Sequence, residues 1–73
     1  MFNNKKTIIE ISGMSCAHCA SRVETSLSKL PNVKKVTVDL SSNTATITSS
    51  KELDIKEVQN TVEDLGYIFI KVK

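Results

Sequence analysis

The chain of 73 residues and 8.0 kDa is 40% hydrophobic and 25% charged, which is typical of one small globular domain and not of a disordered segment. A chain this short has no room for an enclosed substrate cleft with a catalytic apparatus, so we expect a protein that is not an enzyme. The net charge of +2 gives no reason to predict nucleic-acid binding.

Hydrophobic periodicity predicts six elements. Apolar side chains alternate with polar ones in four short segments and recur at i, i+3, i+7 and i+10 in two longer ones. Pro31 lacks an N–H and restricts the residue before it, so the first helix should stop there. The predicted elements are a strand over 7–11, a helix over 17–30, strands over 35–40 and 44–49, a helix over 55–65 and a strand over 68–72.

The second helix has clear boundary signals. Asp54 is a natural N-cap, and Glu57, three residues later, completes a predicted capping box. Leu53 and Val58 stand at the positions of a hydrophobic staple. Gly66 can adopt the left-handed conformation that often ends a helix.

The order of these elements predicts an α+β fold. Two amphipathic helices need one sheet face to cover, and the four strands supply it. Right-handed crossovers then give a ferredoxin-like βαββαβ open-faced sandwich, with a four-stranded antiparallel sheet covered by two helices on one face. We expect residues 1–73 to form a single domain with a structured core over about 6–72.

Residues 13–19, Gly-Met-Ser-Cys-Ala-His-Cys, carry the one motif with specific chemistry. Cys16 and Cys19 lie where a loop runs into a helix, so their thiols can point toward one another, and the positive end of the helix dipole should favour both thiolates. Thiolates are soft ligands that select Cu(I), zinc or clusters. A closed zinc or iron–sulfur site needs four ligands, and His18 is the only histidine. The pair is therefore suited to a low-coordinate ion such as Cu(I).

Other uses of a Cys-x-x-Cys motif fit less well. Haem attachment requires a histidine directly after the second cysteine, where Ala20 stands. A small dithiol oxidoreductase fits the local context, but the thioredoxin-like fold sets a cis-proline against its cysteines, and the only proline is at a helix end. Two buried structural cysteines are awkward because Cys16 lies in the loop and Cys19 is off the apolar stripe. The oxidoreductase stays open as the alternative from another functional class.

Residues 13–24, Gly-Met-Ser-Cys-Ala-His-Cys-Ala-Ser-Arg-Val-Glu, closely resemble the heavy-metal-associated domain of copper chaperones and copper-transporting P-type ATPases. The resemblance covers about residues 6–72 and includes Leu-Pro-Asn-Val at 30–33 and Leu-Gly-Tyr at 65–67. In that family two cysteines bind Cu(I), often in near-linear geometry, and pass it to a partner through shared-thiolate intermediates. The resemblance implies that Cys16 and Cys19 are the metal ligands.

The same resemblance suggests roles for their neighbours. Met14 is expected to pack beneath the loop and not to bind the ion. Ser15 stands where zinc- and cadmium-pump domains commonly carry Asp, which favours copper, although it could also cap the first helix. His18 is expected to face solvent. Tyr67 belongs to a loop that the fold should bring toward the metal loop, where it either shields and tunes the site or is simply a half-buried aromatic residue.

The resulting hypothesis is a cytosolic copper chaperone that binds one Cu(I) per chain and delivers it to a copper-transporting P-type ATPase domain by thiolate exchange. The start at Met1 and an end that coincides with the fold favour a stand-alone protein. An excised N-terminal domain of the ATPase would share the fold and motif, so it remains the alternative within the family. Mercury scavenging is a third alternative, although those relatives carry an export signal that is missing here.

Partners and location follow from charge and hydropathy. Residues 1–38 carry a net charge of +4 and residues 39–73 a net charge of −2. Arg22 and Lys29 on the first helix should therefore steer encounter with an acidic face on the acceptor. A copper-bridged homodimer is also plausible, since two exposed sites could share an ion. Residues 11–21, the longest run without charge, fall well short of the ~20 apolar residues that span a bilayer, so a cytoplasmic protein without membrane insertion is expected.

Overall fold

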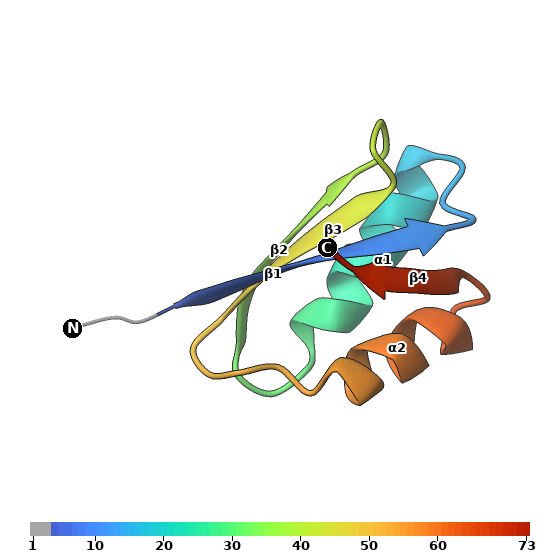
Figure 1. Ribbon diagram of the computed structural model, residues 1–73. Helices are drawn as coiled ribbons and strands as arrows, with labels where there is room; N and C mark the ends of the chain where they lie inside the picture. Colours follow the sequence, from blue (N-terminus) through green and yellow to red (C-terminus); the bar gives the residue numbers. More distant parts are fainter. Residues whose placement is uncertain (1–3) are drawn as a thin grey trace.

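The computed structural model describes residues 4–73 and contains the six expected elements in the expected order. The sheet order is β2-β3-β1-β4, each neighbouring pair is antiparallel, and both helices cover one face of the sheet (Figure 1). The predicted ferredoxin-like βαββαβ sandwich is confirmed. No helix formed by residues 4–73 is long and apolar enough to cross a membrane. The elements are β1 (Lys5–Ser12), α1 (Ala17–Ser28), β2 (Val33–Asp39), β3 (Thr44–Ser49), α2 (Ile55–Asp64) and β4 (Ile68–Val72).

The hydrophobic core lies between the sheet and the two helices. It draws on alternate residues of the strands and on the helical stripes at i and i+4, as the periodicity predicted. Helix α1 packs on the β2 side of the sheet and α2 on the β4 side, and the helices also touch each other. The buried apolar residues are Ile9, Ile11, Met14, Val23, Leu27, Val36, Ala45, Ile47, Val58 and Val62.

Helix α1 ends at Ser28, two residues before the predicted end. The N–H groups of residues 29 and 30 donate to carbonyl oxygens three residues back, at 3.3 and 3.1 Å, so the last turn is tightened. Pro31 disfavours helical geometry in the residue before it. The effect of Pro31 therefore ends the α-helix at Ser28, before the residue that directly precedes the proline.

Helix α2 begins with half of the predicted capping box. The Asp54 side chain accepts a hydrogen bond from the Lys56 N–H at 3.0 Å, which confirms the N-cap. Among the described residues, the Glu57 side chain makes no return hydrogen bond to Asp54. Gly66 follows the helix with φ of 94°, as its left-handed role requires.

In strand β4 the side chain that packs against the core is not one of those whose alternation predicted the strand. The alternation of Ile68 and Ile70 located the strand, but both are exposed, with relative exposures of 59% and 47%, and Phe69 packs against the core. A register shift between Glu10 and Ile11 on β1 adds a bulge where the two strands pair. Both faces of β4 carry apolar residues, so alternation alone cannot tell which face is buried.

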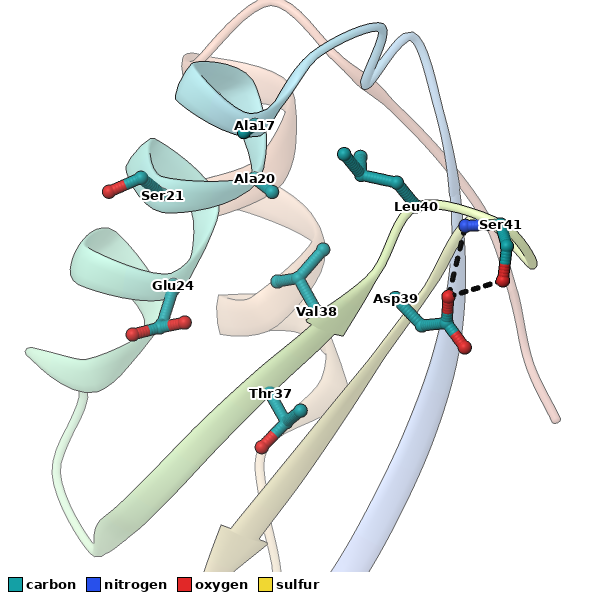
Figure 2. A pocket seen from close by; sticks show the side chains of 9 residues that line it. All are labelled: Ala17, Ala20, Ser21, Glu24, Thr37, Val38, Asp39, Leu40 and Ser41. Carbon is teal, nitrogen blue, oxygen red and sulfur yellow. Dashed lines mark hydrogen bonds between the residues drawn. The ribbon is translucent and has the colours of Figure 1, made fainter.

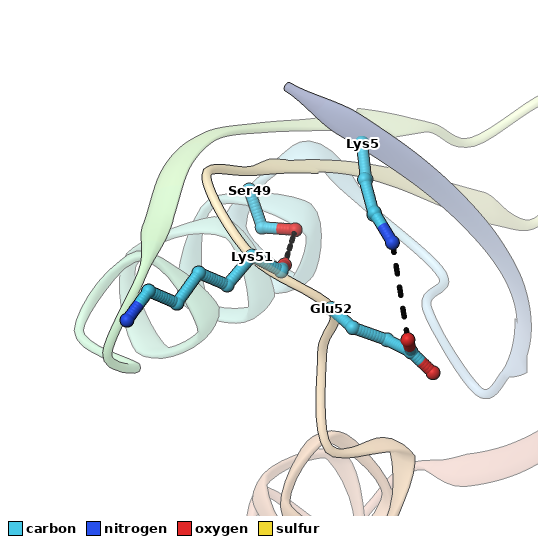
Figure 3. A network of polar contacts seen from close by, with 4 residues as sticks. All are labelled: Lys5, Ser49, Lys51 and Glu52. Atoms are coloured by element: carbon cyan, nitrogen blue, oxygen red, sulfur yellow. Dashed lines mark hydrogen bonds and ion pairs between the residues drawn. The ribbon is translucent and has the colours of Figure 1, made fainter. Parts of the chain in front are cut away.

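The connection from β3 to α2 combines polar contacts (Figure 3) with Leu53, which packs against the core. The fully buried hydroxyl of Ser49 donates to the Lys51 carbonyl at 2.6 Å, so this polar group has a partner. Lys5 and Glu52 form an ion pair at 3.8 Å, with exposed side chains that make it a weak contributor. This connection lies far from the cysteines in the sequence.

The asymmetric cap of α2 gives a first prediction. Asp54→Ala should lower the free energy of unfolding by about 1 kcal/mol, because one helix N–H loses its acceptor. Asp54→Asn should retain most of that stability. Glu57→Ala should cost less than half as much, since its side chain closes no capping bond. Urea denaturation of the three variants measures the differences, and equal losses for Asp54→Ala and Glu57→Ala would contradict the prediction.

Candidate metal centre

The candidate metal loop, residues 13–16, joins the central strand β1 to the N-terminus of α1. Its second residue, Met14, is 5% exposed and belongs to the core cluster, so the expected packing beneath the loop is confirmed. Gly13 has φ of 102°, a conformation that side chains rarely adopt. The loop is thus anchored from below while its remaining residues face outward.

The two thiols come together at the start of α1. The sulfur atoms of Cys16 and Cys19 are 3.4 Å apart, and both cysteines are free. Cys16 is exposed and is itself the N-cap, with an extended backbone and no capping side-chain bond within the described chain. The expectation that Ser15 might cap α1 is therefore wrong, because the helix begins one residue later. Cys19 is half-buried and packs against the core, more than its position off the apolar stripe indicated.

The surroundings of Cys19 favour its thiolate. Its pKa falls from the ordinary 9.0 to about 6, chiefly through hydrogen bonding with the Tyr67 hydroxyl, then with Cys16 and with the backbone of Ser15. Partial desolvation acts in the opposite direction. The thiolate in turn raises the pKa of Tyr67. Sequence reasoning predicted easier ionisation from the helix dipole, whereas the largest cause is a side chain 48 positions away along the chain.

Tyr67 lies beside the metal loop, as expected from the fold. It is half-buried and packs against the core, and its ring comes close to Gly13. The description as a half-buried aromatic residue is therefore confirmed, and this side chain is also the largest influence on the pKa of Cys19.

The other polar neighbours remain outside this arrangement. His18 and Arg22 are exposed on α1, and Lys29 is exposed at its C-cap, in agreement with the sequence prediction. Among residues 4–73, no group of three or more His, Cys, Asp and Glu side chains is placed to hold a metal ion. What the described residues offer is a pair of sulfur donors.

A groove with a volume of about 590 Å³ lies between α1 and β2, and neither cysteine lines it (Figure 2). Ala17 and Ala20 leave room there because their side chains are small, and Val38 and Leu40 face them from the sheet side. The thiol pair thus lies where the exposed loop enters α1, outside this groove. Such a site is accessible to another protein surface.

Comparison with known proteins agrees with this geometry. Residues 8–67 match the heavy-metal-associated domain. The chain belongs to this family. It is 41% identical over 68 residues to the copper-exporting P-type ATPase of Staphylococcus aureus (strain JH9), across 92% of this chain but only 8% of the ATPase.

Two solved structures show the same fold as this heavy-metal-associated domain. The CopZ metallochaperone superposes with a TM-score of 0.84 at 27% identity, over 90% of this chain and 100% of that one. The Cu(I)-loaded N-terminal domain of a potential copper-translocating P-type ATPase from Bacillus subtilis gives 0.85 at 30% identity, over 97% and 92%. The family thus includes both free-standing chains and parts of much longer ones.

The lowered pKa of Cys19 gives a second prediction. Alkylation of Cys19 by iodoacetamide, followed by peptide mass spectrometry, should rise with pH around a midpoint near 6 and not near 9.0. Tyr67→Phe should move this midpoint upward because the largest stabilising contact is removed. A midpoint near 9.0 in the wild-type protein would contradict the assigned environment.

The same shift sets the pH dependence of stability. A thiol with a depressed pKa in the folded state stabilises the fold fully only above its unfolded value. The metal-free domain should therefore gain stability from pH 6 to pH 9 and lose this contribution as pH falls through 6. Urea denaturation of Cys19→Ser across that window should show a smaller gain.

Proposed function

We propose that this chain is a cytosolic copper chaperone, a single non-catalytic domain that binds one Cu(I) through Cys16 and Cys19. It passes the ion to a metal-binding domain of a copper-transporting P-type ATPase. The observation that carries the proposal is the pair of sulfur atoms 3.4 Å apart, one on exposed Cys16 at the end of the loop and one on half-buried Cys19 in the first turn of α1. The copper-related names of the relatives support copper as the cargo.

The donor set supports a soft, low-coordinate ion. Thiolates favour Cu(I) over hard cations, and a structural zinc site usually has four ligands. Metal binding needs deprotonated thiols, and the pKa of Cys19 near 6 means that this ligand is mostly ionised at neutral pH. Proton release then opposes copper binding less than it would at an ordinary cysteine.

The geometry also supports transfer of the ion. With metal–sulfur bonds of about 2.3 Å, two sulfurs on opposite sides of an ion are about 4.6 Å apart. Compared with the observed 3.4 Å, a near-linear site would require the thiols to separate by roughly 1 Å. Cys16 is the exposed thiol and the N-cap residue, so it is better placed to move than half-buried Cys19. The same exposure gives an incoming thiolate access to the ion.

A metal-binding domain of the ATPase itself is the second candidate. The higher identity to the Staphylococcus ATPase, 41% against 27% for CopZ, favours it. The two candidates share ligands and chemistry, so the Cu(I) site is common to both. The reading frame around this sequence distinguishes them, because an ATPase domain must continue into a membrane transporter.

The proposed ligands give a third prediction. Cys16→Ser or Cys19→Ser should abolish retention of Cu(I) against a strong chelator under anaerobic conditions, because each removes one of two soft donors. Cys16→Ser should cost less than about 1 kcal/mol of stability, as at other exposed positions. His18→Ala is the matched control, because it changes the residue between the two cysteines without removing a thiol, and it should retain the ion.

Two outcomes would contradict this assignment. Retention of Cu(I) by either single serine variant would exclude the two-thiolate site. Efficient reduction of insulin by the dithiol form, without copper retention in the wild type, would favour the dithiol oxidoreductase. Sedimentation of the copper-loaded chain tests the predicted copper-bridged homodimer separately.

The charge pattern gives a fourth prediction. Transfer requires the partner's thiolates to reach the metal loop, so the adjoining surface of α1 must lie in the interface. Reversing Arg22 and Lys29 to Glu should slow copper transfer to the ATPase domain at low ionic strength, because favourable steering is lost. Lys51 and Lys56, exposed elsewhere, provide a control with the same change in net charge. Stopped-flow rates that are equal for both double variants at low salt would exclude this interface.

A further inference from the structure

We propose that Gly13 is a positioning residue of the metal loop, where its missing side chain leaves a seat for the Tyr67 ring and keeps that ring beside Cys19. The contact between Gly13 and Tyr67 is independent of any metal. Its consequence for copper rests on the proposed function of Cys16 and Cys19.

The seat is defined by distances. A Cβ atom added at Gly13 would lie 3.3 Å from Cδ1 of Tyr67, 3.7 Å from its Cα and 3.9 Å from its Cβ. The first distance is tighter than ordinary van der Waals contact, so the ring would have to give way by a few tenths of an ångström. The backbone of Gly13 therefore forms one wall of the space that the ring occupies.

Gly66 provides an internal comparison. Both glycines have positive φ, 102° at Gly13 and 94° at Gly66. A Cβ added at Gly66, however, would meet no described atom within 4 Å. Gly66 is thus required by its backbone conformation alone, whereas Gly13 is required by its conformation and by the neighbouring ring. A helix-ending turn explains Gly66 but does not explain the steric demand at Gly13.

The ring connects Gly13 to the thiols. Tyr67 is half-buried against the core, with Gly13 beside it, so its freedom to move is limited. The Tyr67 hydroxyl is the largest influence that lowers the pKa of Cys19, and the Arg22 charge acts on the same phenol. A ring pushed away by a side chain at position 13 would withdraw that hydroxyl from Cys19 and uncover the half-buried sulfur. Gly13 thus acts on Cys19 through Tyr67 and does not itself touch the ion.

A metal-free experiment tests the seat directly. Tyr67 is the only tyrosine and the chain has no tryptophan, so intrinsic fluorescence reports on this ring alone. Gly13→Ala should increase quenching of that fluorescence by iodide, because the displaced ring becomes more exposed. Gly66→Ala, with a similar backbone strain, should leave quenching near the wild-type level. Equal quenching in wild type and Gly13→Ala would overturn the proposal.

Stability measurements separate ring contact from backbone strain. In a Tyr67→Ala background the added Cβ has no Cδ1 to meet, so Gly13→Ala should shift the urea midpoint less than it does in the wild type. The shift caused by Gly66→Ala should be the same in both backgrounds. This comparison remains informative even if Gly13→Ala is only marginally stable. Equal shifts of the urea midpoint for Gly13→Ala in both backgrounds would contradict the proposed contact between Gly13 and the Tyr67 ring.

Copper retention tests the consequence. Tyr67→Ala and Gly13→Ala should each speed the loss of Cu(I) to a chelator by about three- to tenfold, the range of one lost hydrogen bond. The double variant should lose copper no faster than Tyr67→Ala alone, because both changes act through the same ring. A rate of Cu(I) loss in the double variant that equals the product of the two single effects would overturn the proposal. If the wild type binds no Cu(I) while the fluorescence result holds, the proposed function fails and the seat stands.

Discussion

The burial of Met14 is the interaction on which the thiol pair depends. Strand β1 is one of the two central strands of the sheet and pairs with β3 and β4. Its last core residue, Ile11, is separated from Gly13, the first residue of the loop, by one residue. Met14 joins the same core cluster as Ile11 and Val23, so the loop is fixed to the sheet and to α1 together. A free loop would lose conformational entropy each time it ordered two thiols around an ion. Here the buried Met14 already restricts the loop before any ion binds, so less conformational entropy remains to be lost.

This anchoring holds the two cysteines unequally. Cys19 lies in the first turn of α1, half-buried, with Ser15 and Tyr67 acting on its sulfur. Cys16 lies one position outside the helix and is exposed. Two equally buried thiols would hold an ion well but would hinder an incoming ligand, and two exposed thiols would not be preorganised. One half-buried and one accessible sulfur would combine retention with exchange, which is what the proposed carrier function requires.

The sequence predicted features that depend on neighbours along the chain, and missed those that depend on packing across it. Both helical stripes, the Asp54 cap and the Gly66 stop are local signals, and the structure confirms them. Phe69 escaped notice because β4 is apolar on both faces, so its period of two is ambiguous. The cap on α1 was misplaced by one residue, an ordinary uncertainty at helix ends. The contact of Gly13 with Tyr67 joins two ends of the chain, and no local pattern encodes it.

The location of the site explains how one fold can serve both carriers and transporter domains. Solved relatives share this fold although most of their residues differ, so the sandwich itself imposes little choice of ion or partner. Neither cysteine lines the α1–β2 groove, and Met14 beneath the loop belongs to the hydrophobic core. Under the proposed function, selectivity for the ion rests with the few residues around the sulfurs, such as Ser15 and Tyr67. The choice of partner then rests with exposed charges such as Arg22. Ser15 and Arg22 are exposed and outside the core cluster, so they can change without loss of the fold.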